Sequence, residues 1–153
     1  MSDAPAGVAA LVIAEIADGD IEAVIALWRA CGLTRPWNDP ASDIALARRG
    51  PNATVLVGRA DGAVVATAMV GHDGHRGWVY YVAVDPVLQK KGFGRAIMNA
   101  AEAWLRATGL PKLQLLVRRE NAKAGAFYQS LGYEEADTVV FAKWLDGRPA
   151  QKK

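Results

Sequence analysis

The 153-residue chain has only one cysteine, Cys31, and no long apolar run. A single cysteine excludes a disulfide framework and a cysteine-based metal site. Cys31 stands among helix-forming residues just before Gly32, so we expect it to pack rather than to act as a nucleophile. No apolar run reaches membrane-spanning length, and the first residues lack a basic stretch followed by an apolar one. The sequence therefore predicts a cytoplasmic protein that does not enter a membrane.

A strong net charge is also absent. The formal charge of +2 gives no reason to expect a nucleic acid as partner. Hydrophobic residues make up 52% of the chain, which is typical of a folded protein and not of a disordered one. The length suits one domain. We expect a flexible tail over 1–7, a single domain over 8–145 and a basic, flexible tail over 146–153.

Apolar periodicity and turn residues predict an alternation of strands and helices. The expected strands cover 8–16, 54–59, 63–70, 78–84 and 112–117, with one or two closing strands over 133–144. The expected helices cover 20–31, about 42–49, 92–108 and 121–131, with caps from Asp18 or Asp20, from Ser42 or Asp43, and from Asn121. Asp61-Gly62 predicts a tight hairpin. The class is α/β, with a central mixed, mostly antiparallel sheet flanked by helices in the order β-α-α-β-β-β-α-β-α-β.

The most informative stretch runs from Val82 to Ile97. An apolar strand ends at Asp85-Pro86, a loop with two lysines and two glycines follows, and a long amphipathic helix begins there. The free N–H groups at a helix N-terminus form an anion site, and glycines let the backbone approach a ligand closely. Lys90, Lys91 and Arg95 add positive charge. The pattern predicts a site for a phosphate or a pyrophosphate.

Two common phosphate-binding motifs do not fit this loop. No Gly-Lys-Ser/Thr ends it, which excludes a P-loop. Ile97 stands where the third glycine of a dinucleotide-binding fingerprint would be, and the turn comes after several strands. Neither motif therefore accounts for the predicted anion site.

The run Gln89-Lys90-Lys91-Gly92-Phe93-Gly94 resembles the Gln/Arg-x-x-Gly-x-Gly/Ala signature of the GNAT superfamily of N-acetyltransferases. A second block, Asn121 with Phe127-Tyr128 and Leu131-Gly132-Tyr133, resembles the C-terminal motif of that family. The resemblance covers roughly residues 53–144. The loops at 34–40 and 71–77 further resemble those of a bacterial subgroup, the YpeA-like proteins.

The resemblance implies acetyl-CoA as cosubstrate, held by loop amides at its pyrophosphate and polarised at its carbonyl by a backbone N–H of Val82–Val84. The alternative for these three residues is a buried strand without a ligand. The implied cofactor-binding residues are Val82, Ala83, Val84, Gln89, Lys90, Lys91, Gly92, Phe93, Gly94, Arg95, Asn121 and Tyr128.

Tyr128 is the candidate general acid that protonates the departing thiolate, as the resemblance implies. Its phenol, with an unperturbed pKa near ~10, carries a proton at neutral pH. Asn121 lies seven residues earlier, so both share one face of a helix. Asn121 fits helix capping as well as cofactor contact.

The general base is left open among Asp73, His75, Tyr80 and Asp39. The strand at 78–84 contains no glutamate, although the resemblance implies that some relatives place a base there. A water-mediated base, or an acceptor that arrives neutral, is the alternative. His72, Asp73 and His75 stand too close together to form a metal site, and no metal is expected.

The acceptor is expected to be a primary amine that attacks the thioester directly. A small-molecule amine or amino acid is slightly favoured over a protein N-terminus or lysine. The rival is a non-catalytic CoA-binding sensor or interaction module. Oligomeric state is left open, with a homodimer as one option. The candidate acceptor-binding residues are Arg35, Trp37, Asn38, Asp39, Arg76 and Tyr80.

Overall fold

A computed structural model describes residues 10–149 of the chain. The chain divides into two compact units, one ending at Leu116 and the other beginning at Val117, and each is described by itself. The single domain expected over 8–145 stays a prediction. The tail expected over 1–7 and the last four residues of the tail expected over 146–153 lie outside the described residues.

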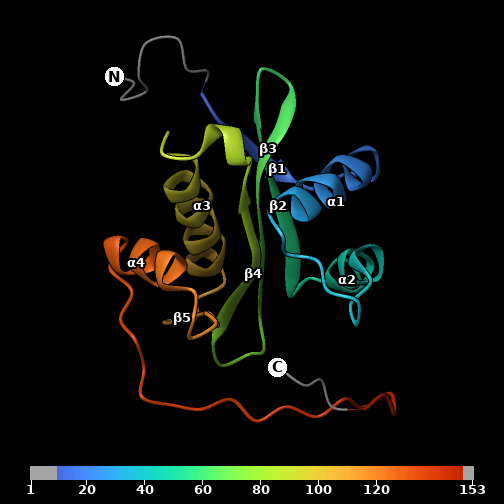
Figure 1. Cartoon of the computed structure of the whole chain (residues 1–153), viewed down its shortest axis with the longest axis vertical. Helices are drawn as coiled ribbons and strands as arrows, with labels where there is room; N and C mark the ends of the chain where they lie inside the picture. The colour runs from blue at the N-terminus through green and yellow to red at the C-terminus, as the bar shows by residue number, and fades with distance from the viewer. Residues whose placement is uncertain (1–9, 150–153) are drawn as a thin grey trace. The chain divides into compact units, whose positions relative to one another are not determined.

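The first unit is built on one five-stranded sheet in the order β1-β2-β3-β4-β5 (Figure 1). β1 to β4 are antiparallel to their neighbours, whereas β5 runs parallel to β4. A parallel pair needs a crossover connection, and the helix α3 supplies it. The strands are Val12–Glu15 (β1), Ala53–Ala60 (β2), Ala63–His72 (β3), Gly77–Val84 (β4) and Leu113–Gln114 (β5). The mixed, mostly antiparallel sheet expected from the sequence is confirmed.

Helices cover both faces of this sheet. Figure 1 shows α1 (Ile21–Ala30) and α2 (Pro40–Ala47) on one face and α3 (Phe93–Ala107) on the other. A short 3-10 turn, η1 (Asp18–Asp20), precedes α1, and a second, η2 (Pro86–Leu88), lies between β4 and α3. The second unit contains the helix α4 (Ala122–Ser130).

The face under α1 and α2 holds a continuous apolar core. Val24 and Trp28 on α1 are fully buried, as their helical spacing predicts, and Ile44 of α2 is 1% exposed. Val55 and Val57 of β2 join the same cluster, because alternate residues of a strand point to one face. This packing fixes α1 and α2 against the sheet.

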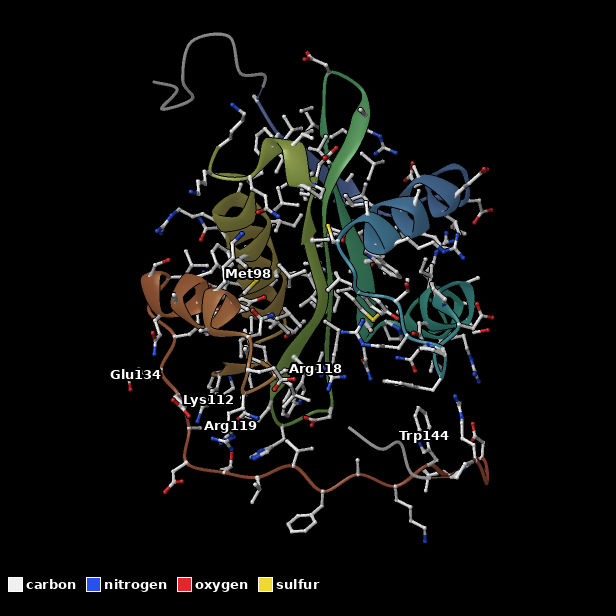
Figure 2. All side chains as sticks on the ribbon, in the orientation of Figure 1. Met98, Lys112, Arg118, Arg119, Glu134 and Trp144 are labelled. Carbon is white, nitrogen blue, oxygen red and sulfur yellow. The ribbon has the colours of Figure 1, made fainter. Side chains whose placement is uncertain are left out.

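The apolar stripe of α3 forms the opposite layer. Ile97, Met98 and Ala101 are fully buried, and Met98 is labelled in Figure 2. Leu105 packs over the start of β4, where a Cβ added to Gly77 would lie 2.4 Å from its Cδ1. The absence of a side chain at Gly77 therefore allows the close approach of helix and strand.

The expected helix caps are partly wrong. α2 begins at Pro40, and its cap is Asp39, whose carboxylate accepts hydrogen bonds from the Ala41 N–H (3.2 Å) and the Ser42 hydroxyl (2.7 Å). Proline suits the first helical turn because the N–H it lacks would have no partner there. Asp20 occupies the cap position of α1, but its carboxylate instead binds the Ala17 N–H and Arg59.

The closing strands expected over 133–144 are wrong for this structure, because residues 133–149 contain no strand. The acidic run at 134–137 is poor in β-forming residues. Val139, Val140 and Phe141 do favour a strand, but they are exposed, and an extended segment becomes a strand only beside a partner. Likewise, β5 is shorter than the strand expected over 112–117, since only Leu113 and Gln114 pair with β4.

Among the described residues, no helix has the length and apolar character needed to span a membrane.

The contact between Gly77 and Leu105 gives a stability prediction. Gly77→Ala should lower the free energy of unfolding by about 1–3 kcal/mol, because the new methyl overpacks a buried leucine. The control is Gly50→Ala, where an added Cβ meets nothing within 4 Å and which should stay within about 0.5 kcal/mol of the parent. Urea denaturation measures both. Equal stabilities of the two variants would show that Leu105 does not pack tightly there.

Candidate active site

The loop between η2 and α3 has a backbone that only a few residues adopt easily. Lys90 has φ +66° and Gly92, the N-cap of α3, has φ +85°. For a residue other than glycine this region costs about 1–2 kcal/mol, so glycine suits position 92. Gly92, Lys90 and Lys91 are exposed, whereas the Phe93 ring is 6% exposed and anchors the start of the helix.

No side chain caps the N-terminus of α3. The Ala96 N–H makes a helical bond, to the Gly92 carbonyl at 3.0 Å, whereas the preceding N–H groups at 93–95 belong to the first turn and have no helical acceptor. These amides carry the positive end of the helix dipole, and Lys90, Lys91 and Arg95 add exposed cationic side chains around them. The arrangement is suited to a phosphate group, as the sequence predicts.

Asp85 fixes the turn that leads into this loop. Its carboxylate accepts a hydrogen bond from the Val87 N–H (3.1 Å), and its carbonyl accepts one from the Leu88 N–H (2.8 Å). The Asp85 N–H in turn donates to the Val65 carbonyl of β3 at 2.8 Å. The loop is therefore tied to the sheet at its first residue.

A β-bulge interrupts β4 just before this turn. Met69 pairs with Tyr80 and Thr67 pairs with Ala83, so Ala68 alone faces both Tyr81 and Val82. A bulge takes backbone groups out of the regular ladder and bends the strand. On its other edge β4 pairs with β5 only at Gly77 and Trp78. The stretch Val82–Val84 therefore lies beside a bulge and beyond the end of the β5 pairing.

Four residues at the bulge make contacts that the sequence did not reveal. Tyr81 has φ +52°, and its ring stacks on the indole of Trp28, with 3.7 Å between ring centroids. Its hydroxyl donates to Asp43 at 2.6 Å. The Thr67 hydroxyl donates to the Tyr81 carbonyl (2.9 Å) and accepts from the Trp28 indole N–H (2.8 Å). The available signal was the hydroxyl of Thr67, which stands in an otherwise apolar run at 63–70, since a buried polar group needs a partner.

Hydrogen bonds within the loop between α1 and α2 hold its backbone and side chains together. The Arg35 guanidinium donates to the carbonyls of Gly32 (2.7 Å) and Thr34 (2.9 Å), and the Asn38 N–H donates to the Arg35 carbonyl (3.1 Å). The Ser42 hydroxyl and backbone N–H groups lower the pKa of Asp39. Trp37 and Asn38 are half-buried beside them. Arg35, Trp37, Asn38 and Asp39 thus stand on one loop, as the sequence requires.

The loop between β3 and β4 is organised around Asp73. Its carboxylate accepts from the N–H groups of Arg76 (2.8 Å) and His75 (2.9 Å), and the Trp78 indole N–H lies 3.4 Å away. The Arg76 N–H, followed by that of His75, lowers the pKa of Asp73, which makes it a weaker base. His75 is exposed.

Tyr80 is the most exposed residue of the middle of β4, with 48% of its surface accessible. Partial burial and the nearby charge of Asp73 raise the pKa of its phenol, so it carries a proton at neutral pH. Tyr80 therefore fits substrate contact better than proton abstraction.

Asn121 and Tyr128 lie on α4 in the second unit. The Asn121 side chain accepts from the Ala124 N–H at 3.1 Å, so its expected role as a helix cap is confirmed. Tyr128 meets Phe127 and Tyr133 edge to face, with ring centroids 5.0 and 5.9 Å apart. Burial raises the pKa of Tyr128 to about 12, because a phenolate is poorly solvated there. The phenol is held in the protonated form that an acid requires.

Farther along this unit, the Arg148 guanidinium lies 3.9 Å above the ring of Trp144, which Figure 2 labels. This cation–π contact joins two residues near the end of the described chain.

Cys31 faces the end of β4. Its thiol donates to the Val84 carbonyl at 3.2 Å, and burial raises the pKa of the thiol. A raised pKa lowers the thiolate fraction, which disfavours a nucleophilic role. Within residues 10–149, no three His, Cys, Asp or Glu side chains gather as metal ligands.

A family model described as "Acetyltransferase (GNAT) family" matches residues 21–133. The chain belongs to this acetyltransferase family. The match spans the first unit from α1 onward and includes α4. Both the loop between η2 and α3 and Tyr128 therefore fall within it.

This GNAT chain is similar to an acetyltransferase of Yersinia enterocolitica, with 42% identity over 126 residues, or 82% of this chain and 89% of the relative. Among solved structures it is similar to the ribosomal-protein-S18-alanine N-acetyltransferase of Escherichia coli, with 26% identity and a TM-score of 0.70 over 83% of this chain and 79% of that one.

A more distant structure shares the fold. The aminoglycoside acetyltransferase AAC(6')-Iy, solved with the bisubstrate analogue CoA-S-monomethyl-acetylneamine, has a TM-score of 0.77 at 17% identity, over 88% of this chain and 98% of that one. The family match and the 42% identical relative confirm the GNAT resemblance, and the chain is an acetyltransferase of that family. The YpeA-like subgroup, a homodimer and the cytoplasmic location stay predictions.

Proposed function

We propose that this GNAT protein transfers an acetyl group from acetyl-CoA to a primary amine by direct attack. The uncapped N-terminus of α3, with its αL glycine and three exposed cations, is the observation that carries the proposal. This donor set suits a pyrophosphate, and acetyl-CoA supplies a pyrophosphate and an activated acetyl thioester. Gln89 to Arg95 would hold the pyrophosphate.

Each proposed residue has one task in the reaction. Backbone N–H groups of Val82–Val84 donate to the carbonyl oxygen, on which negative charge develops. The amine nitrogen forms a bond to the carbonyl carbon as the carbon–sulfur bond breaks, and Tyr128 gives its proton to the departing sulfur. Asn121 contacts the cosubstrate in addition to its cap. Cys31 takes no part, because no acyl-enzyme is formed.

The proton on the attacking nitrogen needs an acceptor. Among the proposed bases, Asp73 is weakened by the N–H groups that lower its pKa. The proposal therefore assigns the proton to His75 or to a water molecule. An amine that arrives neutral needs no base before it attacks, and it loses its proton to water once the bond to the carbonyl carbon has formed.

The proposed acceptor is a small-molecule amine or an amino acid, recognised by Arg35, Trp37, Asn38, Asp39, Arg76 and Tyr80. The exposed Asp39 favours an amine that also carries positive charge, and the guanidinium of Arg76 can pair with a carboxylate. The relatives support both small and protein acceptors, since one acts on an aminoglycoside and another on an alanine of a ribosomal protein.

Binding of acetyl-CoA is tested by thermal unfolding. A ligand of the folded state at a hundredfold excess over its Kd adds about 2.7 kcal/mol to the stability and raises the Tm. The shift should disappear in the Gly92→Ala/Gly94→Ala double variant. It should persist in Gly109→Ala, which has the same φ of +85° at the other end of α3. No shift of the parent protein at millimolar acetyl-CoA would contradict the proposal.

An amine screen for released free CoA follows a positive result, and it separates an enzyme from a sensor. Turnover with any amine supports the transferase. Saturable binding without release across amino acids, polyamines and aminoglycosides would support a non-catalytic CoA-binding module instead.

The role of Tyr128 is tested by Tyr128→Phe, which keeps the ring and removes the proton. We expect kcat to fall about a hundredfold while the affinity for acetyl-CoA changes little. Because burial raises the pKa of Tyr128 to about 12, the parent rate should not decline through loss of this proton up to about pH 10. Tyr133→Phe, on the neighbouring ring, is the matched control. Normal kcat in Tyr128→Phe would remove this residue from the mechanism.

A further inference from the structure

The bulge in β4 depends on one residue in an unusual conformation. Tyr81 has φ +52°, a value that a residue with a side chain adopts only when its surroundings hold it there. Such conformations gather at functional sites. A regular strand would aim the following peptide groups in other directions. In this chain the following residues are Val82 to Val84, to which the proposed function assigns the carbonyl contact.

Three contacts hold Tyr81 from different directions. Trp28 covers the face of its ring at a centroid distance of 3.7 Å and an interplanar angle of 9°. Asp43 accepts its hydroxyl proton at 2.6 Å, and Thr67 donates to its backbone carbonyl at 2.9 Å. Ring, hydroxyl and carbonyl are therefore each fixed by a different element: α1, α2 and β3.

The contacts form one connected network. The fully buried Thr67 hydroxyl accepts from the Trp28 indole N–H at 2.8 Å while it donates to the Tyr81 carbonyl. Its two hydrogen bonds fix the direction of its single proton, which must point at Tyr81. Trp28 thus constrains both the ring and, through Thr67, the carbonyl of Tyr81.

This network also adjoins the acceptor loop. Trp28 lies on the helix before the loop at 33–39, and Asp43 lies in the first turn of the helix after it. The hydroxyl of Tyr81 is therefore bound by the helix that directly follows the loop with four of the proposed acceptor residues. A substitution at Trp28, before the loop, or at Asp43, after it, would therefore act on the bulge through the side chain of Tyr81.

We propose that Tyr81 is a positioning residue, held by Trp28, Thr67 and Asp43, that keeps the β4 bulge in the conformation in which the amides of Val82–Val84 meet the acyl carbonyl. The inference rests on the proposed acetyl transfer and adds the residues that prepare the strand for it. Preorganised donors lower a barrier because they need not reorient during the reaction.

The test compares Tyr81→Phe, Asp43→Ala and Asp43→Asn. The first two remove the hydrogen bond, whereas the asparagine oxygen still accepts the phenol proton. We expect kcat to fall about tenfold or more in Tyr81→Phe and Asp43→Ala, with KM for acetyl-CoA within about twofold of the parent, because misplaced reacting groups cost rate more than binding. Asp43→Asn should retain most of the parent kcat.

The control is Asp18→Asn, which removes a carboxylate that pairs with Arg48 of the α2 end on the protein surface. It should leave kcat unchanged. A second readout needs no substrate: amide hydrogen exchange at 82–84 in the free protein should be faster in Tyr81→Phe than in the parent. Exchange at 97–101, in the buried part of α3, should stay equal, which separates a loosened bulge from general destabilisation.

Parent-like kcat and parent-like exchange in Tyr81→Phe would overturn the inference while leaving the proposed function intact. A loss of kcat in Asp43→Asn as large as in Asp43→Ala would also overturn it, because the charge and not the hydrogen bond would then matter. A parent protein that neither binds acetyl-CoA nor releases CoA would overturn the proposed function and the inference together.

Discussion

The departure of β4 from its regular ladder is the constraint on which the rest of the first unit depends. Up to Tyr80 the strand pairs residue for residue with β3, and from Ala83 on it does so again. Between them the backbone turns through a left-handed residue, and Asp85 then directs the chain into the loop before α3. The bulge and the uncapped N-terminus of α3 therefore both lie along the chain that leads from the end of β4.

The chemistry proposed for this family member needs rigid backbone donors more than reactive side chains. The amides at 93–95 are fixed because the buried stripe of α3 holds the helix on the sheet. The amides at 82–84 follow a residue that three elements hold in place. The proposal gives a chemical role to few side chains, and burial keeps the main candidate, Tyr128, protonated well beyond neutral pH.

Local features were predictable from the sequence, and features that join distant segments were not. The Asp61-Gly62 turn follows from a pair of residues that tolerate positive φ, and both have it, at +51° and +80°. The glycine loop and the cap by Asn121 are local in the same way. By contrast, the hydrogen bond between Trp28 and Thr67 joins residues 39 apart in the chain, and that between Tyr81 and Asp43 joins residues 38 apart. Hydrophobic periodicity cannot predict such contacts. The closing strands failed for a related reason, since strand-forming residues at 139–141 do not specify a partner.

The central claim, that backbone amides at the start of α3 grip the pyrophosphate of acetyl-CoA, is tested most directly by nuclear magnetic resonance. The amide proton and nitrogen shifts of residues 92–95 are followed during titration with CoA. The account predicts that these amides move together with the occupancy of CoA, with protons shifted downfield as each begins to donate to a phosphate oxygen. A protein saturated with CoA whose amides at 92–95 do not move would contradict it.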